Sequence, residues 1–97
     1  MHLQIITPEQ VIFDAEIDSV TLPGKDGEFQ ILNNHAPIVA TLGQGTIKIA
    51  VHESTYKTFD DKSGKVYTSP SHIKTLLFDI IGGTIELNNN KVIVLAN

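Results

Sequence analysis

The residues that could do chemistry in this chain are four histidines and a small number of carboxylates. Glu28 and His35 lie within one stretch, GEFQILNNHAP, and side chains of these two types could act as a general acid and a general base. Asp14, Glu16 and Asp18 form a second group, but their alternate spacing is typical of a solvated strand face. Any chemistry depends on whether the fold brings such residues together.

No recognised catalytic or metal-binding motif is present. The histidines match neither HxH nor HExxH, and the chain has no cysteine that could bind zinc or act as a nucleophile. Gly82-Gly83 is not followed by the lysine of a phosphate-binding loop, and no serine stands in a nucleophile motif. We therefore expect a protein that is not an enzyme and that uses no metal and no cofactor. The histidines are His2, His35, His52 and His72.

Charge and composition exclude further classes of function. The 97 residues carry a formal net charge of −4, and the lysines are scattered singly with no arginine. Nucleic acid is not an expected partner, because phosphate neutralisation requires clustered cations. The N-terminal stretch MHLQIITPEQ lacks the features of a secretory signal, and no apolar run approaches the roughly 20 residues of a membrane span. We expect a bacterial cytoplasmic protein that meets a membrane only through its partners.

The sequence predicts an all-β fold in a single domain, residues 1–97. The stretch TIKIAV places Ile47 and Ile49 on one face of a strand and Lys48 on the other. Such alternation recurs along the chain with turn residues between, which predicts a flattened β-sandwich of about nine or ten mostly antiparallel strands and no helix. The stretch EIDSVTL is interpreted as one strand with a bulge near Asp18 and Ser19, because its apolar phase slips there.

Residues 52–74 differ from the rest of the chain. They are polar and rich in turn residues, and their alternation is weak. We interpret them as an elongated hairpin or insertion with its tip near Ser63-Gly64. A disordered loop is the alternative.

Several strands are apolar on both faces, although a two-layer sandwich needs only one apolar face in each layer. The surplus could be covered by residues 52–74 and the terminal segments, or it could form a protein-binding surface. Both interpretations remain open from the sequence. The candidate outward residues of the closing strands are Leu77, Ile81, Ile93 and Leu95.

Three blocks of the sequence resemble a known family. They are HLQIITPEQVIFDAEIDSVTLPGKDGEFQIL, NNHAPIVATLGQG and IIGGTIELNNNKVIVLAN, and in this order and spacing they resemble the N-terminal β-sandwich domain of the epsilon subunit of F-type ATP synthase. The resemblance implies a non-catalytic central-stalk (rotor) subunit of a proton-translocating enzyme, peripheral to the cytoplasmic face of the bacterial inner membrane. It also implies two partners, the gamma subunit and the ring of c subunits.

The resemblance further implies roles for particular residues. The GEF element and the loop before HAP match the parts of the family that approach the c ring. The implied c-ring contacts are Asp26, Gly27, Glu28, Phe29, Asn33, Asn34 and His35. Gamma would then bind an outward apolar face, for which Leu77, Ile81, Ile93 and Leu95 are the candidates.

This chain departs from the family pattern in two places. Asn33-Asn34 replaces the family's proline-glycine turn, and asparagine tolerates the left-handed backbone that such a turn requires. The sequence given stops at Asn97, where most members continue into a helical hairpin that can inhibit ATP hydrolysis. If these 97 residues are the whole gene product, we expect no inhibition of that kind, and a longer product would remove this expectation. The alternative function is a stand-alone β-sandwich ligand-binding module, for example for carbohydrate, although two tyrosines and no tryptophan make a sparse aromatic surface.

Overall fold

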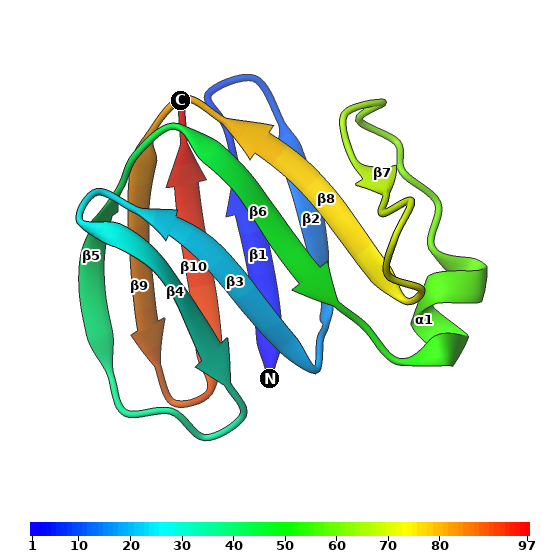
Figure 1. Ribbon diagram of the computed structural model, residues 1–97, viewed down its shortest axis with the longest axis horizontal. Coiled ribbons are helices and arrows are strands. Elements are labelled where there is room, and N and C mark those ends of the chain that lie inside the picture. Colours follow the sequence, from blue (N-terminus) through cyan, green and yellow to red (C-terminus); the bar gives the residue numbers. More distant parts are fainter.

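The computed structural model describes residues 1–97 as ten strands and one short helix (Figure 1). Helix α1 (Glu53–Thr58) has six residues, and no helix has the length and apolar character needed to cross a membrane. The strands are β1 (His2–Ile6), β2 (Val11–Glu16), β3 (Ser19–Gly24), β4 (Gly27–Leu32), β5 (Ile38–Leu42), β6 (Gly45–Ala50), β7 (Tyr67–Thr68), β8 (Thr75–Ile80), β9 (Gly83–Asn88) and β10 (Lys91–Ala96).

The strands belong to one sheet that folds over into two facing layers (Figure 1). The first layer has the order β2-β1-β10-β9-β5, and the second has the order β4-β3-β6-β8-β7. The layers join at β5, which pairs with β9 along its length and with β3 only where Leu42 meets Gly24. All pairs are antiparallel except β1 with β10. The predicted sandwich of mostly antiparallel strands is therefore confirmed.

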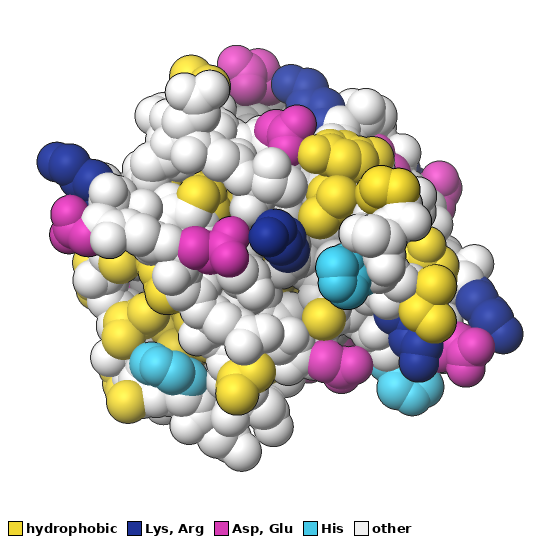
Figure 2. All heavy atoms as spheres, viewed as in Figure 1, with side chains coloured by type: hydrophobic (Ala, Val, Ile, Leu, Met, Phe, Trp, Pro, Cys, Tyr) yellow, Lys and Arg dark blue, Asp and Glu magenta, His cyan; other side chains and the backbone are white.

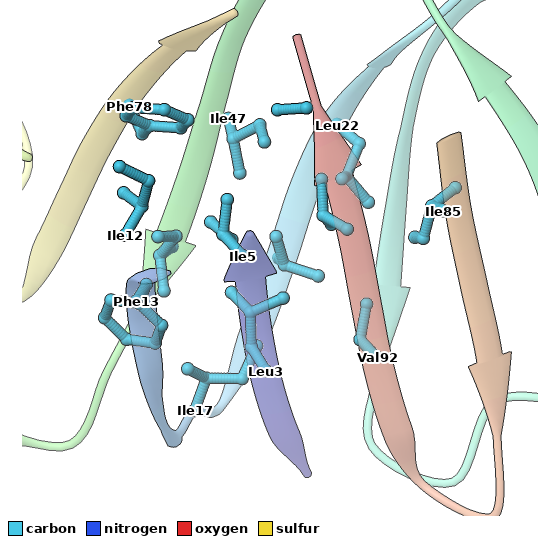
Figure 3. Close-up of a cluster of buried hydrophobic side chains, with 14 of the residues drawn as sticks. Leu3, Ile5, Ile12, Phe13, Ile17, Leu22, Ile47, Phe78, Ile85 and Val92 are labelled. Carbon is cyan, nitrogen blue, oxygen red and sulfur yellow. The ribbon is translucent and has the colours of Figure 1, made fainter. Parts of the chain in front are cut away.

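One hydrophobic core of 20 buried residues fills the space between the layers. Figure 3 shows Leu3 and Ile5 of the first layer directed toward the same interior as Ile47 and Phe78 of the second. These residues alternate with outward neighbours along each strand, because successive side chains of a strand point to opposite faces. Burial of this apolar surface is the main term that stabilises the fold.

The predicted bulge near Asp18 and Ser19 is wrong. Strand β2 ends at Glu16 and β3 begins at Ser19, so the slip in apolar phase marks the connection between two strands of different layers. The N–H of Asp18 bonds to the carbonyl of Ala50 at 2.8 Å, which attaches this connection to β6. The register shift that does occur lies between Ile5 and Ile6, opposite β2.

Residues 52–74 contain a helix that the sequence did not predict. The imidazole Nδ1 of His52 accepts a hydrogen bond from the N–H of Ser54 at 3.2 Å and caps α1. The turn expected at Ser63-Gly64 is present, and Gly64 has a φ of 73°. Tyr56, Phe59 and Val66 are partly buried against the core. This segment therefore contributes three partly buried side chains to the edge of the core.

Candidate interaction surfaces

The turn between β3 and β4 presents three of the predicted residues to solvent. Lys25 and Asp26 connect Gly24 to Gly27, which face each other across the hairpin. Gly27 has a φ of 132°, a backbone conformation that favours glycine. Asp26, Gly27 and Glu28 are exposed, whereas Phe29 is half-buried and packs against the core. The acidic turn is thus available to a partner, and Phe29 helps to hold it in place.

Asn33, Asn34 and His35 form the exposed loop after β4. Asn34 has a φ of 64°, which confirms that asparagine supplies the left-handed position of this turn. The Nδ1 atom of His35 lies 2.6 Å from the carbonyl oxygen of Ala36, so its imidazole braces the turn.

This loop is joined to the turn between β9 and β10. The Nδ2 group of Asn90 donates to Oδ1 of Asn33 at 2.8 Å. The Oδ1 atom of Asn90 accepts from the N–H of Asn34 at 2.9 Å. Asn90 therefore positions two residues of a loop that is far from it in sequence, a role that the sequence did not reveal.

Glu28 and His35 do not form an acid and base pair. They lie near opposite ends of β4, and each has a different partner. The Oε2 atom of Glu28 is 3.4 Å from Nζ of Lys48 on β6, across the outer face of the second layer. The seven residues predicted to contact the c ring thus lie in two turns at the two ends of one edge strand.

The four predicted gamma-binding residues lie on two different faces. Ile93 and Leu95 alternate with the buried Val92 and Val94, so they face outward from the first layer. Leu77 faces outward from the second layer beside Tyr67 of β7. Ile81 follows β8 and lines a shallow hollow with residues 44–46 and 79, which also belongs to the second layer. One flat partner surface cannot contact all four residues.

The outer face of the first layer carries a continuous apolar patch. Leu95 lies opposite Ile6 in the register of β10 with β1, and Ile6 lies opposite Val11 in the register of β1 with β2. Ile93 is the next outward residue along β10. Leu95 and Val11 are 53% and 52% exposed. We call these four residues, Ile6, Val11, Ile93 and Leu95, the first-layer apolar patch.

A polar cluster borders this patch at the other ends of β1 and β2. The Nε2 atom of His2 lies 2.5 Å from Oδ1 of Asp14, and its Nδ1 atom lies 3.3 Å from Oε1 of Glu16. The N-terminal ammonium lies 3.2 Å from the Glu16 carboxylate and is the main cause that lowers the pKa of Glu16. No group of three acidic, histidine or cysteine side chains has the geometry of a metal site.

Figure 2 presents the outer face of the second layer, where acidic, lysine, histidine and hydrophobic side chains lie dispersed among uncharged polar side chains and backbone. This face contains a groove of about 520 Å³ whose walls carry mostly hydroxyl and amide groups. At its edge the hydroxyls of Tyr67 and Thr46 both donate to Oδ1 of Asp79, at 2.7 and 2.8 Å. The hydrogen bond to Asp79 is the main cause that raises the pKa of Tyr67.

The fold is a small β-sandwich, and its candidate interaction residues lie in two surface turns and on its two outer faces. Comparison with known proteins identifies its family. The family model described as "ATP synthase, Delta/Epsilon chain, beta-sandwich domain" matches residues 1–73. The chain belongs to this family, which confirms the resemblance found in the sequence.

Several relatives named "ATP synthase epsilon chain" extend the match to nearly the whole chain. The protein from Chlorobaculum tepidum is 39% identical over 94 residues, which are 97% of this chain and 85% of that protein. The protein from Desulforamulus reducens is 36% identical over 96 residues, which are 99% of this chain and 58% of that protein. The chain thus spans 85% of the length of the Chlorobaculum tepidum protein but only 58% of the length of the Desulforamulus reducens protein.

Solved structures share the fold at lower sequence identity. A chain in the cryo-EM structure of the Euglena gracilis mitochondrial ATP synthase, with OSCP, F1 and c-ring, matches with a TM-score of 0.70 and 19% identity over 97% of this chain and 48% of that chain. A chain from the central stalk and c-ring of the Tetrahymena thermophila enzyme matches with a TM-score of 0.62 and 17% identity, over 99% of this chain and 62% of that chain.

Proposed function

We propose that this chain is a non-catalytic subunit of the central stalk of a proton-translocating F-type ATP synthase, where it binds gamma and docks on the c ring to couple rotation to ATP synthesis. Family membership and the relatives named as epsilon chains support this role. Because gamma and the c ring hold it, the chain is peripheral to the cytoplasmic face of the bacterial plasma membrane.

The observation that carries the proposal is the first-layer apolar patch. Its four residues come from three adjacent strands, and the pairing of those strands makes them contiguous. Exposed contiguous apolar surface on a small protein marks a site of interaction with another protein. The second layer offers no comparable area, since Leu77 lies in a polar groove and Ile81 is isolated from it. Gamma therefore binds through Ile93, Leu95 and their neighbours Ile6 and Val11.

Binding to the cognate gamma subunit tests this assignment. Leu95→Asp places a charge within the patch and is expected to weaken gamma binding at least tenfold, because the carboxylate would have to be desolvated. The matched control is Ile81→Asp on the other layer, where a side chain that is 71% exposed is replaced by the same charge. Calorimetric titration of both variants measures the difference. Equal affinity of the two variants, or a loss confined to Ile81→Asp, would contradict the assignment.

We assign the contact with the c ring to the two turns at the ends of β4. The acidic turn at Asp26 and Glu28 provides charge, and the loop at Asn33–His35 provides polar groups held by Asn90. Such exposed charges set register and specificity more than affinity.

Cysteine crosslinking in the assembled complex tests the ring contact. The chain has no cysteine, so a single cysteine at Glu28 reports only on that position. A crosslink to the polar loop of a c subunit is expected for Glu28→Cys and not for Thr58→Cys, which lies in α1 on the far side of the sandwich (Figure 1). Absence of a Glu28 crosslink in complexes that contain the subunit would count against docking.

A further inference from the structure

Strand β4 is an edge strand whose outer backbone groups are unpaired. It pairs with β3 alone. Gly24 and Gly27 close a two-residue hairpin, and such a closing pair is hydrogen-bonded, with bonded and non-bonded pairs alternating along the ladder. Gly27, Phe29 and Ile31 therefore bond to β3. The N–H and C=O groups of Glu28 and Gln30 point away from the sheet.

Three hydrogen bonds support this direction independently. On β3 the carbonyl of Pro23 accepts from Gly43 at 2.8 Å, and just beyond it the N–H of Lys25 donates to Thr41 at 3.0 Å, both on the side away from β4. The carbonyl of Leu32 accepts from His35 at 3.2 Å, beyond the β3 ladder. Outside that ladder no backbone hydrogen bond involves Glu28 or Gln30.

β4 lacks the devices that normally protect an edge. Natural sheets shield their edges with very short strands, proline, lysine or bulges. The other free edges have more protection: β7 has two residues, and β2 carries the register shift and packs against Phe59. The outer edge of β5 has five residues and is held at one end by the pairing of Leu42 with Gly24. β4 has six residues in the sequence GEFQIL, with no proline or lysine and an unshifted register.

There is space beside this edge. A groove of about 570 Å³ runs between residues 24–29 and residues 39–41, on the side of the molecule away from α1 (Figure 1). Val39 of β5 lines this groove and is 79% exposed. Val39 also lines a shallower hollow with Glu86 of β9, on the outer face of the first layer. The groove at β4 is thus continuous with the face that carries the apolar patch.

We propose that β4 accepts an extended segment of the gamma subunit by strand addition, through the backbone groups of Glu28 and Gln30. This inference rests on the proposed binding of gamma to the first-layer face, because continuity through Val39 brings the same partner to the groove. The segment offers its own N–H and C=O groups to β4 and an apolar side chain to Val39, as in other cases where a peptide extends a sheet. The side chains of Asp26 and of Asn33–His35 lie beyond the paired stretch, and the side chain of Glu28 points to the outer face of the second layer, so these groups remain free for the c ring.

A proline at position 30 tests the proposal. Gln30→Pro removes an N–H that does not bond to β3, so the hairpin is retained while strand addition is blocked. The matched control is Gln30→Thr, which changes the side chain and keeps the N–H. We expect Gln30→Pro to bind cognate gamma at least tenfold more weakly than Gln30→Thr. Equal affinity of the two folded variants would overturn the proposal.

Hydrogen exchange of the wild-type chain gives a second measurement, which decides the question even if Gln30→Pro does not fold. The Glu28 and Gln30 amides are expected to exchange at least tenfold more slowly in the gamma complex than in the free chain. Protection that appears only with the c ring would assign the edge to the ring and would overturn the proposal. Protection in the free chain at high concentration would assign it to a second copy and would overturn the proposal as well.

If gamma binding responds to Leu95→Asp but these amides stay unprotected, strand addition fails and the proposed function stands. Failure of wild-type gamma binding would overturn both.

Discussion

The ring of Phe13 on β2 packs against the ring of Phe59, with centroids 5.4 Å apart and an interplanar angle of 32°. Phe13 is 2% exposed, and Phe59 is half-buried just beyond the end of α1. The pair joins the edge strand of the first layer to the segment that leads into β7 of the second. One side of the sandwich is therefore closed by residues 52–74, which in the sequence have the character of a surface loop.

Replacement of Phe59 by alanine should destabilise the whole fold. Truncation of a fully buried phenylalanine costs about 3–5 kcal/mol, whereas an aromatic pair contributes about 0.5–1.5 kcal/mol beyond its buried area. For the half-buried Phe59 we expect the free energy of unfolding to fall by about 2 kcal/mol, measured by urea denaturation. Lys57→Ala is the control, because Lys57 is exposed and pairs only with Glu53 at 3.4 Å. Similar losses in the two variants would show that Phe59 is not part of the core.

A methyl group at Gly83 should also be destabilising. A Cβ atom there would lie 2.3 Å from the carbonyl oxygen of Leu95 and 3.1 Å from Cα of Ala96, both in the backbone of β10. We expect Gly83→Ala to lower the free energy of unfolding by about 1–3 kcal/mol, as overpacking does. At Gly43 the nearest atom to a new Cβ is Cα of Lys25 at 3.7 Å, an ordinary contact. Thermal unfolding should thus leave Gly43→Ala near the wild type, and the reverse order would contradict the packing described here.

The ionisation of Tyr67 should depend on Asp79. Its hydrogen bond to the Asp79 carboxylate favours the neutral phenol and raises the pKa of Tyr67 above 10.0. Because the folded pKa is raised, the stability from this bond is present below the unfolded pKa and is lost as pH rises through the folded value. Asp79→Asn should return the Tyr67 pKa toward 10.0. Ultraviolet absorbance titration in a Tyr56→Phe background measures it, and an unchanged midpoint would refute the coupling.

Asp61 should keep the loop after α1 ordered down to unusually low pH. Burial alone would raise the pKa of Asp61, but hydrogen bonds from the Ser63 hydroxyl and from the N–H groups of Val66 and Ser63 outweigh it and lower the pKa below 3.8. A lowered carboxyl pKa gives stability that is present above the unfolded pKa and is lost as pH falls through the folded value. The amide signals of Ser63 and Val66 should therefore titrate below pH 3.8.

Two variants provide the controls for this titration. Asp61→Asn should abolish it, whereas Asp60→Asn should leave its midpoint in place, since Asp60 makes no side-chain hydrogen bond to the loop. A midpoint at or above the ordinary aspartate value in the wild type would mean that the hydrogen bonds do not govern the carboxyl group.

Strands and inward faces could be predicted from the sequence because a period of two persists wherever one face is buried. The alternation in β6, β9 and β10 is therefore read correctly. The left-handed turns were also predictable from residue type, as Asn34, Asn89 and Asn90 all have positive φ. Helix α1 escaped prediction because six residues make fewer than two helical turns, too few to show a helical period.

The grouping of surface residues could not be predicted, because alternation gives the face of a strand but not its neighbours. Leu77 and Leu95 both alternate with buried residues, yet their strands lie in opposite layers, so the two side chains face away from each other. Likewise Glu28 and His35 are near in sequence, but an extended strand separates them. Only the strand order shows that Ile6 and Val11 extend the surface of Leu95.

The parallel pairing of β1 with β10 has a consequence for synthesis. β1 leaves the ribosome well before its partner β10, so five register pairs between residues 2–6 and 91–95 form only after the strands between them have been made. Until these pairs form, the inner strands of the first layer have unpaired edges. The nascent chain is then held together by the β1–β2 and β3–β4 hairpins. Such long-range pairing makes folding slow, in the range of about milliseconds to seconds. During that interval chaperones would meet a chain in which β1 and β10 have yet to pair.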